Sequence, residues 1–262
     1  MNGEKAPYGV VSYDGVDLYH GECLAVMDEL IQRGVKVDAI ITDPPYGTTA
    51  CKWDSVIPFD AMWERLNQLI KPNGAIVLFG SEPFSSMLRM SNLKNYKYDW
   101  KWKKEQGVGF QIAKYRPMME TEDIMVFCDK NKSPFYKPQM IPLETPKIEK
   151  FAASKSGSVP IANLNKGERV VTHRYPKNVI EVTRDRGFHP TQKPVALMEY
   201  LIKTYTNEGE LVLDFTMGSG TTCVAAYNTS RKCIGIEMDD NYFEVAKQRV
   251  SDAINTKASQ LF

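Results

Sequence analysis

An apolar, β-branched run at residues 36–42 (KVDAIIT) is the first strong element of the chain. This composition predicts a strand, and the DPPYG sequence at residues 43–47 predicts a rigid loop at its end. Apolar side chains then recur at helical spacing over residues 59–70, and KPNG at 71–74 breaks that helix before an apolar strand at 75–79. Strand, helix and strand in this order predict a parallel βαβ unit.

The rest of the chain continues this alternation on both sides of one unusual stretch. Before it, we expect a helix from an N-cap at Ser81 to about Met90, and strands at 96–102 and 124–128. After it, the expected elements are a helix at about 194–206, a strand at 210–215, a helix to about 228, a strand at 232–237 and a helix from 241 to about 254. The pattern predicts an α/β fold with a doubly wound, mostly parallel sheet.

The unusual stretch covers residues 129–187. It is rich in Lys, Pro, Ser and Asn, shows little periodicity, and is too long for an ordinary loop. We therefore predict an irregular inserted segment at 129–187 between two halves of one domain, residues 1–128 and residues 188–262.

Composition narrows the class of protein without indicating a function. With 43% hydrophobic and 25% charged residues the chain is typical of globular proteins, and no run approaches the roughly 18 apolar residues of a membrane span. The start of the chain lacks the pattern of a secretory signal, so we expect a cytoplasmic protein. Five widely spaced cysteines favour buried thiols over a disulfide framework or a zinc site. The net charge of +1 does not indicate nucleic-acid binding, so any basic surface that binds DNA must be confined to one part of the protein.

Two loops follow predicted strands at their carboxyl ends, where parallel sheets bind ligands. In the second, DFTMGSGTT at 214–222, two glycines allow a tight turn and the threonines open a helix whose free N–H groups favour negative charge. The third glycine of a dinucleotide fingerprint is replaced by Cys223, and the Gly-Lys-Ser/Thr of a P-loop is missing. Glu237, after the next strand, fits a ribose-hydroxyl acceptor. The residues favour a nucleoside cofactor without a long phosphate tail.

The first loop suits a planar base that carries an exocyclic amine. Asp43 and the carbonyl of Pro44 can accept the two amino hydrogens, the prolines hold the nearby carbonyls in fixed directions, and Tyr46 supplies a flat ring for stacking. Such hydrogen bonds would draw the nitrogen lone pair out of conjugation and aim it at an electrophile.

Together these motifs resemble the amino-methylating DNA methyltransferases, in the permuted class whose catalytic half precedes its cofactor half. The resemblance rests on DPPY at 43–46, GSGTT at 218–222, FHPTQKP at 188–194, GECL at 21–24, and WKK at 102–104 with Phe110, Lys114 and Pro117. It implies the fold of S-adenosylmethionine-dependent methyltransferases, S-adenosylmethionine as cofactor and double-stranded DNA as substrate. It also implies association with the nucleoid, and it is compatible with a homodimer and with a separate restriction endonuclease.

The resemblance also implies which residues act. The catalytic residues would be Asp43, Pro44, Pro45 and Tyr46. The cofactor-binding residues would be Glu22, Thr191, Lys193, Asp214, Phe215, Gly218, Ser219, Gly220, Thr221, Thr222 and Glu237, with no metal ligand. This chain departs from the family at two of these positions, because its cofactor strand ends Asp-Phe-Thr instead of Asp-Pro-Phe, and Glu22 replaces an Asp.

The implied reaction is direct methyl transfer to adenine N6 of a nucleotide flipped out of duplex DNA. Aspartate at the first loop position favours adenine over cytosine N4, for which serine is common, but cytosine N4 stays open. An RNA or protein amide methyltransferase is a further alternative, and such enzymes more often carry asparagine there. A ring-carbon cytosine methyltransferase would need a Pro-Cys nucleophile, which the sequence lacks.

Target recognition has two candidate regions. Segment 129–187 intersperses basic residues with turn formers, a composition that can order on a nucleic acid through phosphate and base contacts. Its basic residues include Lys130, Lys132, Lys137, Arg169, His173, Arg174 and Lys177. The second region is the lysine-rich edge at residues 94–104, near Trp100 and Trp102. We predict that segment 129–187 reads the target.

Overall fold

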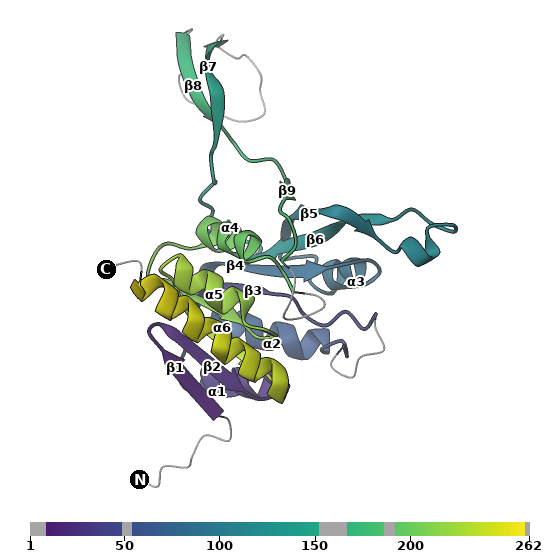
Figure 1. Ribbon diagram of the computed structural model, residues 1–262, viewed down its shortest axis with the longest axis vertical. Coiled ribbons are helices and arrows are strands. Elements are labelled where there is room, and N and C mark those ends of the chain that lie inside the picture. The colour runs from purple at the N-terminus through teal and green to yellow at the C-terminus, as the bar shows by residue number, and fades with distance from the viewer. Residues whose placement is uncertain (1–8, 49–53, 152–166, 186–191, 260–262) are drawn as a thin grey trace. The chain divides into compact units, whose positions relative to one another are not determined.

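The computed structural model of the chain describes residues 9–48, 54–151, 167–185 and 192–259 (Figure 1). The chain divides into two compact units. The larger unit consists of residues 1–137 and 178–262, and the smaller one is Pro138–Lys177. The candidate loops both belong to the larger unit.

Within the described residues, nine strands form one sheet in the order β1-β2-β11-β10-β3-β4-β6-β5-β9. The strands are β1 Gly9–Tyr13, β2 Val16–His20, β3 Val37–Thr42, β4 Ile70–Gly80, β5 Tyr96–Val108, β6 Met119–Phe127, β9 Val179–Glu181, β10 Leu211–Asp214 and β11 Lys232–Glu237. The run from β2 through β11, β10 and β3 to β4 is parallel, whereas β1 and β6 pair antiparallel with their neighbours. The sheet is therefore mostly parallel, as predicted.

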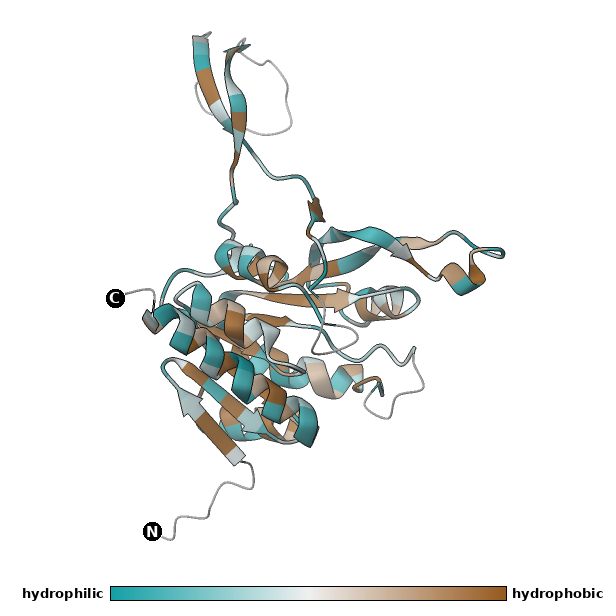
Figure 2. Ribbon diagram, in the orientation of Figure 1, coloured by the Kyte–Doolittle hydropathy of each residue, from teal (hydrophilic) through white to brown (hydrophobic). Residues whose placement is uncertain are grey.

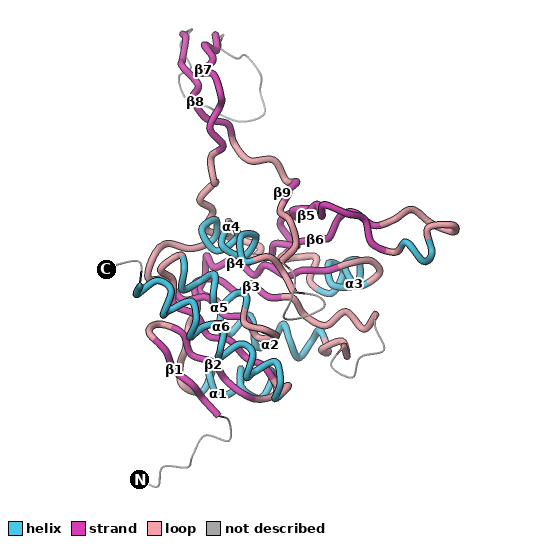
Figure 3. Tube along the Cα trace, viewed as in Figure 1, coloured by secondary structure: helices cyan, strands magenta, loops and turns pink. Residues whose placement is uncertain are grey.

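Helices cover both faces of this sheet (Figures 1 and 3). They are α1 Cys23–Gln32, α2 Phe59–Leu69, α3 Phe84–Ser91, α4 Val195–Tyr205, α5 Thr221–Asn228 and α6 Asp240–Ser259. Alternate residues of one strand enter different cores: Ala39 and Ile41 pack with α4, α5 and α6, while Ile40 packs with α1, α2 and α3. A strand buried on both faces reads as a continuous apolar run, which Figure 2 shows as brown along the central strands. The doubly wound α/β prediction is confirmed.

The predicted elements at 36–42, 59–70, 194–206, 210–215 and 232–237 lie within one or two residues of their observed bounds. Strands β4, β5 and β6 and helix α6 extend five or six residues beyond the predicted bounds, and KPNG at 71–74 lies within β4. Strands β1 and β2 and helix α1 were not predicted, and the two strands are only five residues long with a mixed pattern of buried and exposed residues. The N-cap prediction at Ser81 is wrong. Helix α3 begins at Phe84 after Pro83, and the Glu82 carboxylate accepts the Ser86 N–H of its first turn at 3.2 Å.

The prediction of an irregular segment at 129–187 is wrong in its central part. Strands β7, Ile141–Phe151, and β8, Gly167–Arg174, pair antiparallel as a β-hairpin, and β9 joins the main sheet. Nearly every hairpin side chain whose exposure is described is exposed. A strand with no buried face has no need to alternate apolar and polar residues, so the sequence carried no period-2 signal.

None of the helices in the described ranges is both long and apolar enough to cross a membrane.

Candidate active site

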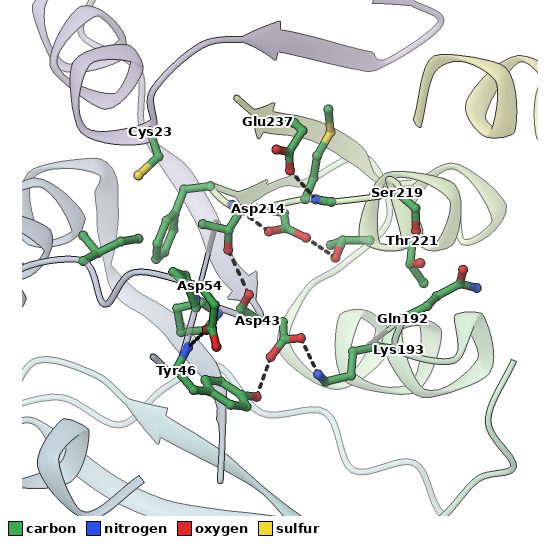
Figure 4. Close-up of a pocket in the computed structure, with 18 of the residues that line it drawn as sticks. Cys23, Asp43, Tyr46, Asp54, Gln192, Lys193, Asp214, Ser219, Thr221 and Glu237 are labelled. Atoms are coloured by element: carbon green, nitrogen blue, oxygen red, sulfur yellow. Dashed lines mark hydrogen bonds and ion pairs between the residues drawn. The ribbon is translucent and has the colours of Figure 1, made fainter. Parts of the chain in front are cut away.

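The two loops meet because their strands are neighbours. Parallel strands β3 and β10 end side by side, so residues 43–47 and 215–220 lie at the same edge of the sheet. Side chains join them: the Thr42 hydroxyl donates to Asp214 at 2.6 Å, and the Thr216 hydroxyl donates to the Asp43 carbonyl at 3.1 Å. Asp43 and Thr216 are 173 residues apart in sequence, yet these contacts join their two loops into one structural unit (Figure 4).

Asp214 is the centre of this join. Its carboxylate is 3% exposed and accepts hydrogen bonds from the hydroxyls of Thr42 and Thr222 and from the Thr216 N–H. Burial raises the pKa of this carboxyl to about 6 despite these donors. Asp214 was predicted to bind the cofactor, and its observed contacts hold the two loops together.

A second buried carboxylate shapes the first loop. Asp54, 7% exposed, accepts the backbone N–H groups of Tyr46 at 2.8 Å, Gly47 at 2.8 Å and Thr48 at 2.9 Å. Three hydrogen bonds to one carboxylate give this short loop a fixed backbone. The sequence contained no pattern that would have singled out Asp54.

Asp43 lies in a cluster of charged and polar side chains (Figure 4). The Tyr46 hydroxyl is 2.5 Å from one Asp43 oxygen, and the Lys193 ammonium forms an ion pair with the other. Glu122 of β6 completes the cluster: its carboxylate lies 2.9 Å from both the Tyr46 hydroxyl and the Lys193 ammonium, and 2.8 Å from the Lys104 ammonium. The Asp43 side chain is 24% exposed, whereas Lys193 and Glu122 are 7% exposed.

These contacts set different proton affinities on the two carboxyls. Burial raises the pKa of Asp43, and Lys193 only partly offsets that effect. Burial acts in the same direction on Glu122, but Lys193 and Lys104 lower its pKa to about 2. Burial opposes the charge of Lys193, yet its two carboxylate neighbours raise its pKa overall. Glu122 and Lys193 are therefore charged at neutral pH, and Asp43 is the more readily protonated carboxyl.

The ring of Tyr46 has one face occupied. Phe84 stacks on it with centroids 5.0 Å apart and planes inclined by 28°. A flat ligand could therefore stack only on the opposite face.

A cavity of about 640 Å³ is lined by both loops. Its lining includes all four predicted catalytic residues, Asp43, Pro44, Pro45 and Tyr46. It also includes most predicted cofactor-binding residues: Glu22, Lys193, Asp214, Phe215, Gly218, Ser219, Thr221, Thr222 and Glu237. Thr191 lies outside the described residues. The structure thus brings the two predicted residue sets to one cavity.

Gly220 is the predicted residue that does not line this cavity. Its φ is +77°, and a Cβ there would lie 2.9 Å from the Cβ of Ala246. Glycine is needed at this position because α6 packs directly against the loop. Arg249 of the same helix donates to the hydroxyls of Ser219, at 2.8 Å, and Thr221, at 3.0 Å.

Two further predicted residues organise backbone at the cavity edge. Glu237 accepts the N–H groups of Gly218, Met238 and Asp239 at 2.8–2.9 Å. Glu22 is the N-cap of α1 and accepts from Leu24 and Ala25. Phe215, which is displaced by one position from the family pattern, is fully buried and packs with the core on the α1 side. Each residue therefore has a structural contact in addition to its place at the cavity.

The comparisons with known proteins agree with this geometry. The family described as DNA methylase (N6_N4_Mtase) matches residues 37–248, which span β3 through α6. The chain belongs to this family.

Relatives and a solved structure match the methylase over most of its length. It is 32% identical to the Type II methyltransferase M.HpaI of Haemophilus parainfluenzae, over 84% of this chain and 69% of the relative. It is 26% identical to the DNA adenine methyltransferase YhdJ of Escherichia coli (strain K12), over 93% and 85% of the two chains. The crystal structure of the M1.HpyAVI–SAM complex superimposes with a TM-score of 0.62 and 28% identity, covering 90% of this chain and 98% of the other.

Sequence reasoning missed several residues of the methylase site. Glu122, Lys104 and Gln192 line the cavity beside the predicted residues. Glu122 belongs to none of the recognised motifs. Its position as a charged residue directly beside the apolar run of β6 is unusual, and this was the one signal from which the sequence could have indicated it. Gln192 stood within a quoted motif, and its side-chain oxygen is buried and has no hydrogen-bond partner among the described residues.

The lysine-rich edge at 94–104 is largely paired with acidic side chains. Lys101 contacts Asp99 and Asp123, and Lys103 contacts Glu181 at 3.3 Å. Lys104 points into the site, as described above. The half-buried and buried pairs of Lys101 and Lys104 weaken the interpretation of the edge as a set of phosphate contacts, whereas the Lys103–Glu181 pair is exposed.

Proposed function

We propose that this methylase transfers a methyl group from S-adenosylmethionine to N6 of adenine in duplex DNA. The observation that carries the proposal is a single cavity in which the Asp43–Tyr46 loop lies beside the glycine loop of residues 214–222. The names of the relatives support the substrate, since YhdJ is called a DNA adenine methyltransferase and M.HpaI a Type II methyltransferase. The complex of M1.HpyAVI with SAM supports the cofactor.

The cavity residues suit this cofactor. The buried, unpartnered oxygen of Gln192 would accept a hydrogen bond from the ammonium of the methionine part. Glu237 uses three of roughly four acceptor positions on its backbone bonds, which leaves one for a ribose hydroxyl. Met238, whose side chain is exposed, gives the cavity apolar surface for an adenine ring. When bound, S-adenosylmethionine supplies an electrophilic methyl group and keeps the electron pair of the broken carbon–sulfur bond.

Asp43 would hold the amine of the target base. Its two oxygens each accept one hydrogen bond, from Tyr46 and Lys193, so each keeps a lone pair for an amino hydrogen. The base would stack on the face of Tyr46 opposite Phe84. After transfer, the nitrogen must lose one proton, and the raised pKa of Asp43 makes this carboxylate a suitable acceptor.

A base in a duplex cannot reach this loop, so the target nucleotide would be flipped out of the helix. Unstacking and unpairing cost a few kcal/mol, which contacts in the cavity and on the vacated duplex must offset.

The test is incubation with labelled S-adenosylmethionine and unmethylated genomic DNA, followed by nucleoside analysis. We expect label in N6-methyladenine. Label in N4-methylcytosine would support the cytosine alternative, and label only in RNA or protein would contradict the proposal. A base-analogue substrate with 2-aminopurine at the target position would report flipping as a rise in fluorescence.

For target recognition, we propose the unit Pro138–Lys177. Support comes from its exposed strands and from basic side chains held only by surface ion pairs, such as Arg169 with Glu149 and Lys150 with Glu168. Such pairs contribute little to stability, so these side chains can exchange an acidic partner for a DNA phosphate. Hydrogen exchange in the hairpin should slow when substrate DNA is added, and unchanged exchange during normal methylation would contradict this role. A homodimer, a separate restriction endonuclease and association with the nucleoid stay predictions.

A further inference from the structure

Glu122 is a buried carboxylate that takes no direct part in the proposed reaction. It lies on β6, opposite Trp102 of β5, with its side chain 7% exposed. One oxygen contacts both the Tyr46 hydroxyl and the Lys193 ammonium at 2.9 Å, and the other contacts Lys104 at 2.8 Å. A buried charge persists when it is paired on all sides, as it is here. Two of its three partners are also the two side chains that contact Asp43.

This sharing limits how strongly Asp43 is held. The Tyr46 hydroxyl has one proton but lies within hydrogen-bond distance of both carboxylates. The Lys193 ammonium divides its charge between the same two groups. If Glu122 were neutral, both donors would turn to Asp43 alone. Asp43 would then be a weaker acceptor for a third partner.

We propose that Glu122 is a positioning residue for methyl transfer, which draws Tyr46 and Lys193 away from Asp43 and so leaves Asp43 free to take the amine hydrogen bond and then its proton. This inference rests on the proposed function of the site. In the step itself, the proton leaves the nitrogen for an Asp43 oxygen, and the electrons of that N–H bond stay on nitrogen.

The charges around Asp43 predict the sign of a pH effect. Asp43 is faced by Tyr46 from its own loop, Lys193 from the segment before α4, Glu122 from β6 and Asp214 from β10. Lys104 of β5 acts through Glu122. Removing the charge of Glu122 should lower the pKa of Asp43, because a neighbouring negative charge is lost and Lys193 turns to Asp43. Two carboxyls with different proton affinities in one site are a common arrangement for acid–base work.

The experiment compares Glu122→Gln with Asp123→Asn on genomic DNA. Asp123 is the next residue of β6, is also buried, and pairs with Arg89 at 2.7 Å and Lys101 at 2.5 Å, away from the cavity lining. It therefore controls for the loss of a buried, paired carboxylate. We expect Glu122→Gln to lower kcat on the order of tenfold to a hundredfold, at or below the lower limit of what a positioned acid–base group contributes directly. Its Kd for S-adenosylmethionine should stay within about twofold, and Asp123→Asn should leave kcat near wild type.

The pH profile separates positioning from a general loss of stability. The acidic limb of kcat should move to lower pH in Glu122→Gln. In Lys104→Met it should move to higher pH, because Glu122 then competes more strongly for Lys193 and its negative charge, which raises the pKa of Asp43, is less neutralised. Opposite shifts would support the inference, and this second variant keeps the test decisive if Glu122→Gln does not fold.

Two results would overturn it: a Glu122→Gln profile that matches Asp123→Asn, or shifts of the same sign in both site variants. If the wild-type protein does not methylate DNA, it is instead the proposed function that fails.

Discussion

The loops at the ends of β3 and β10 and the hairpin β7–β8 are built in opposite ways. In the loops, the carboxylates of Asp54 and Asp214 are buried and each accepts three hydrogen bonds from the loops or their neighbours. In the hairpin, the ion pairs lie on the surface and the strands have no buried face. A reacting group must be held within a fraction of an ångström, whereas a surface that binds a polyanion can adjust to it. The contrast predicts which changes affect chemistry and which affect only binding.

The largest effect is expected for Asp43→Ala. Loss of the acceptor for the target amine should lower turnover by at least about 10² to 10³, since no other group of the loop takes its place. Binding of S-adenosylmethionine should stay within a few-fold, as measured by calorimetry. The control is Asp99→Ala, which removes a carboxylate paired with Arg89 and Lys101. Near-normal turnover in Asp43→Ala would show that the ordered loop does not carry the chemistry.

The next largest effect is a dependence of the free energy of unfolding on pH, caused by Asp214 between the two loops. The pKa of Asp214 is about 6 in the fold and 3.8 in a free chain, so the folded protein binds more protons between these values. Its stability contribution is therefore lost as pH rises from about 4 to 6, by at most about 3 kcal/mol. Asp214→Asn should remove this pH dependence from the free energy of unfolding in urea. An unchanged slope would mean that the carboxylate is not held in the way its contacts indicate.

Glu237→Ala should weaken binding of S-adenosylmethionine by about 1–3 kcal/mol, the range for losing a charged hydrogen-bond partner. Three backbone N–H groups would lose their acceptor as well. Glu22→Ala is a useful comparison, because it removes a different backbone acceptor at the same cavity. A dissociation constant that does not change in Glu237→Ala would leave this residue with a structural role alone.

The smallest effect on stability is expected in the hairpin. Arg169→Ala should change the free energy of unfolding by less than about 0.5 kcal/mol, because its partner Glu149 is also exposed. It should weaken DNA binding and reduce the slope of log K against log salt by about 1. Glu149→Ala provides the matched control, since it breaks the same pair but keeps the positive charge. Equal DNA affinity in both variants would remove the hairpin from the recognition surface.

The sequence by itself determined the doubly wound sheet, the DNA methylase family and the two loops. The sheet and the loops follow from local signals, because buried parallel strands are continuous apolar runs and prolines and glycines mark the loops at their ends. The family follows from the resemblance of motifs such as DPPY at 43–46 and GSGTT at 218–222. The family and the fold are confirmed, and the two loops line one cavity. The roles of individual residues stay predictions, although the structure already gives Asp214, Gly220 and Glu22 contacts within the fold.

Only the tertiary structure decided the partners of Asp43. Glu122 lies 76 residues from Tyr46, and Lys193 lies 150 residues from Asp43. These contacts depend on the strand order β3-β4-β6 and on the position of the segment before α4, and the local sequence pattern predicts neither of them.

The hairpin was not predicted, for a different reason. Its strands are paired by backbone hydrogen bonds, which almost any sequence can form. Because these strands have no buried face, their sequence does not need to alternate apolar and polar residues, and that alternation is the signal by which a strand is predicted.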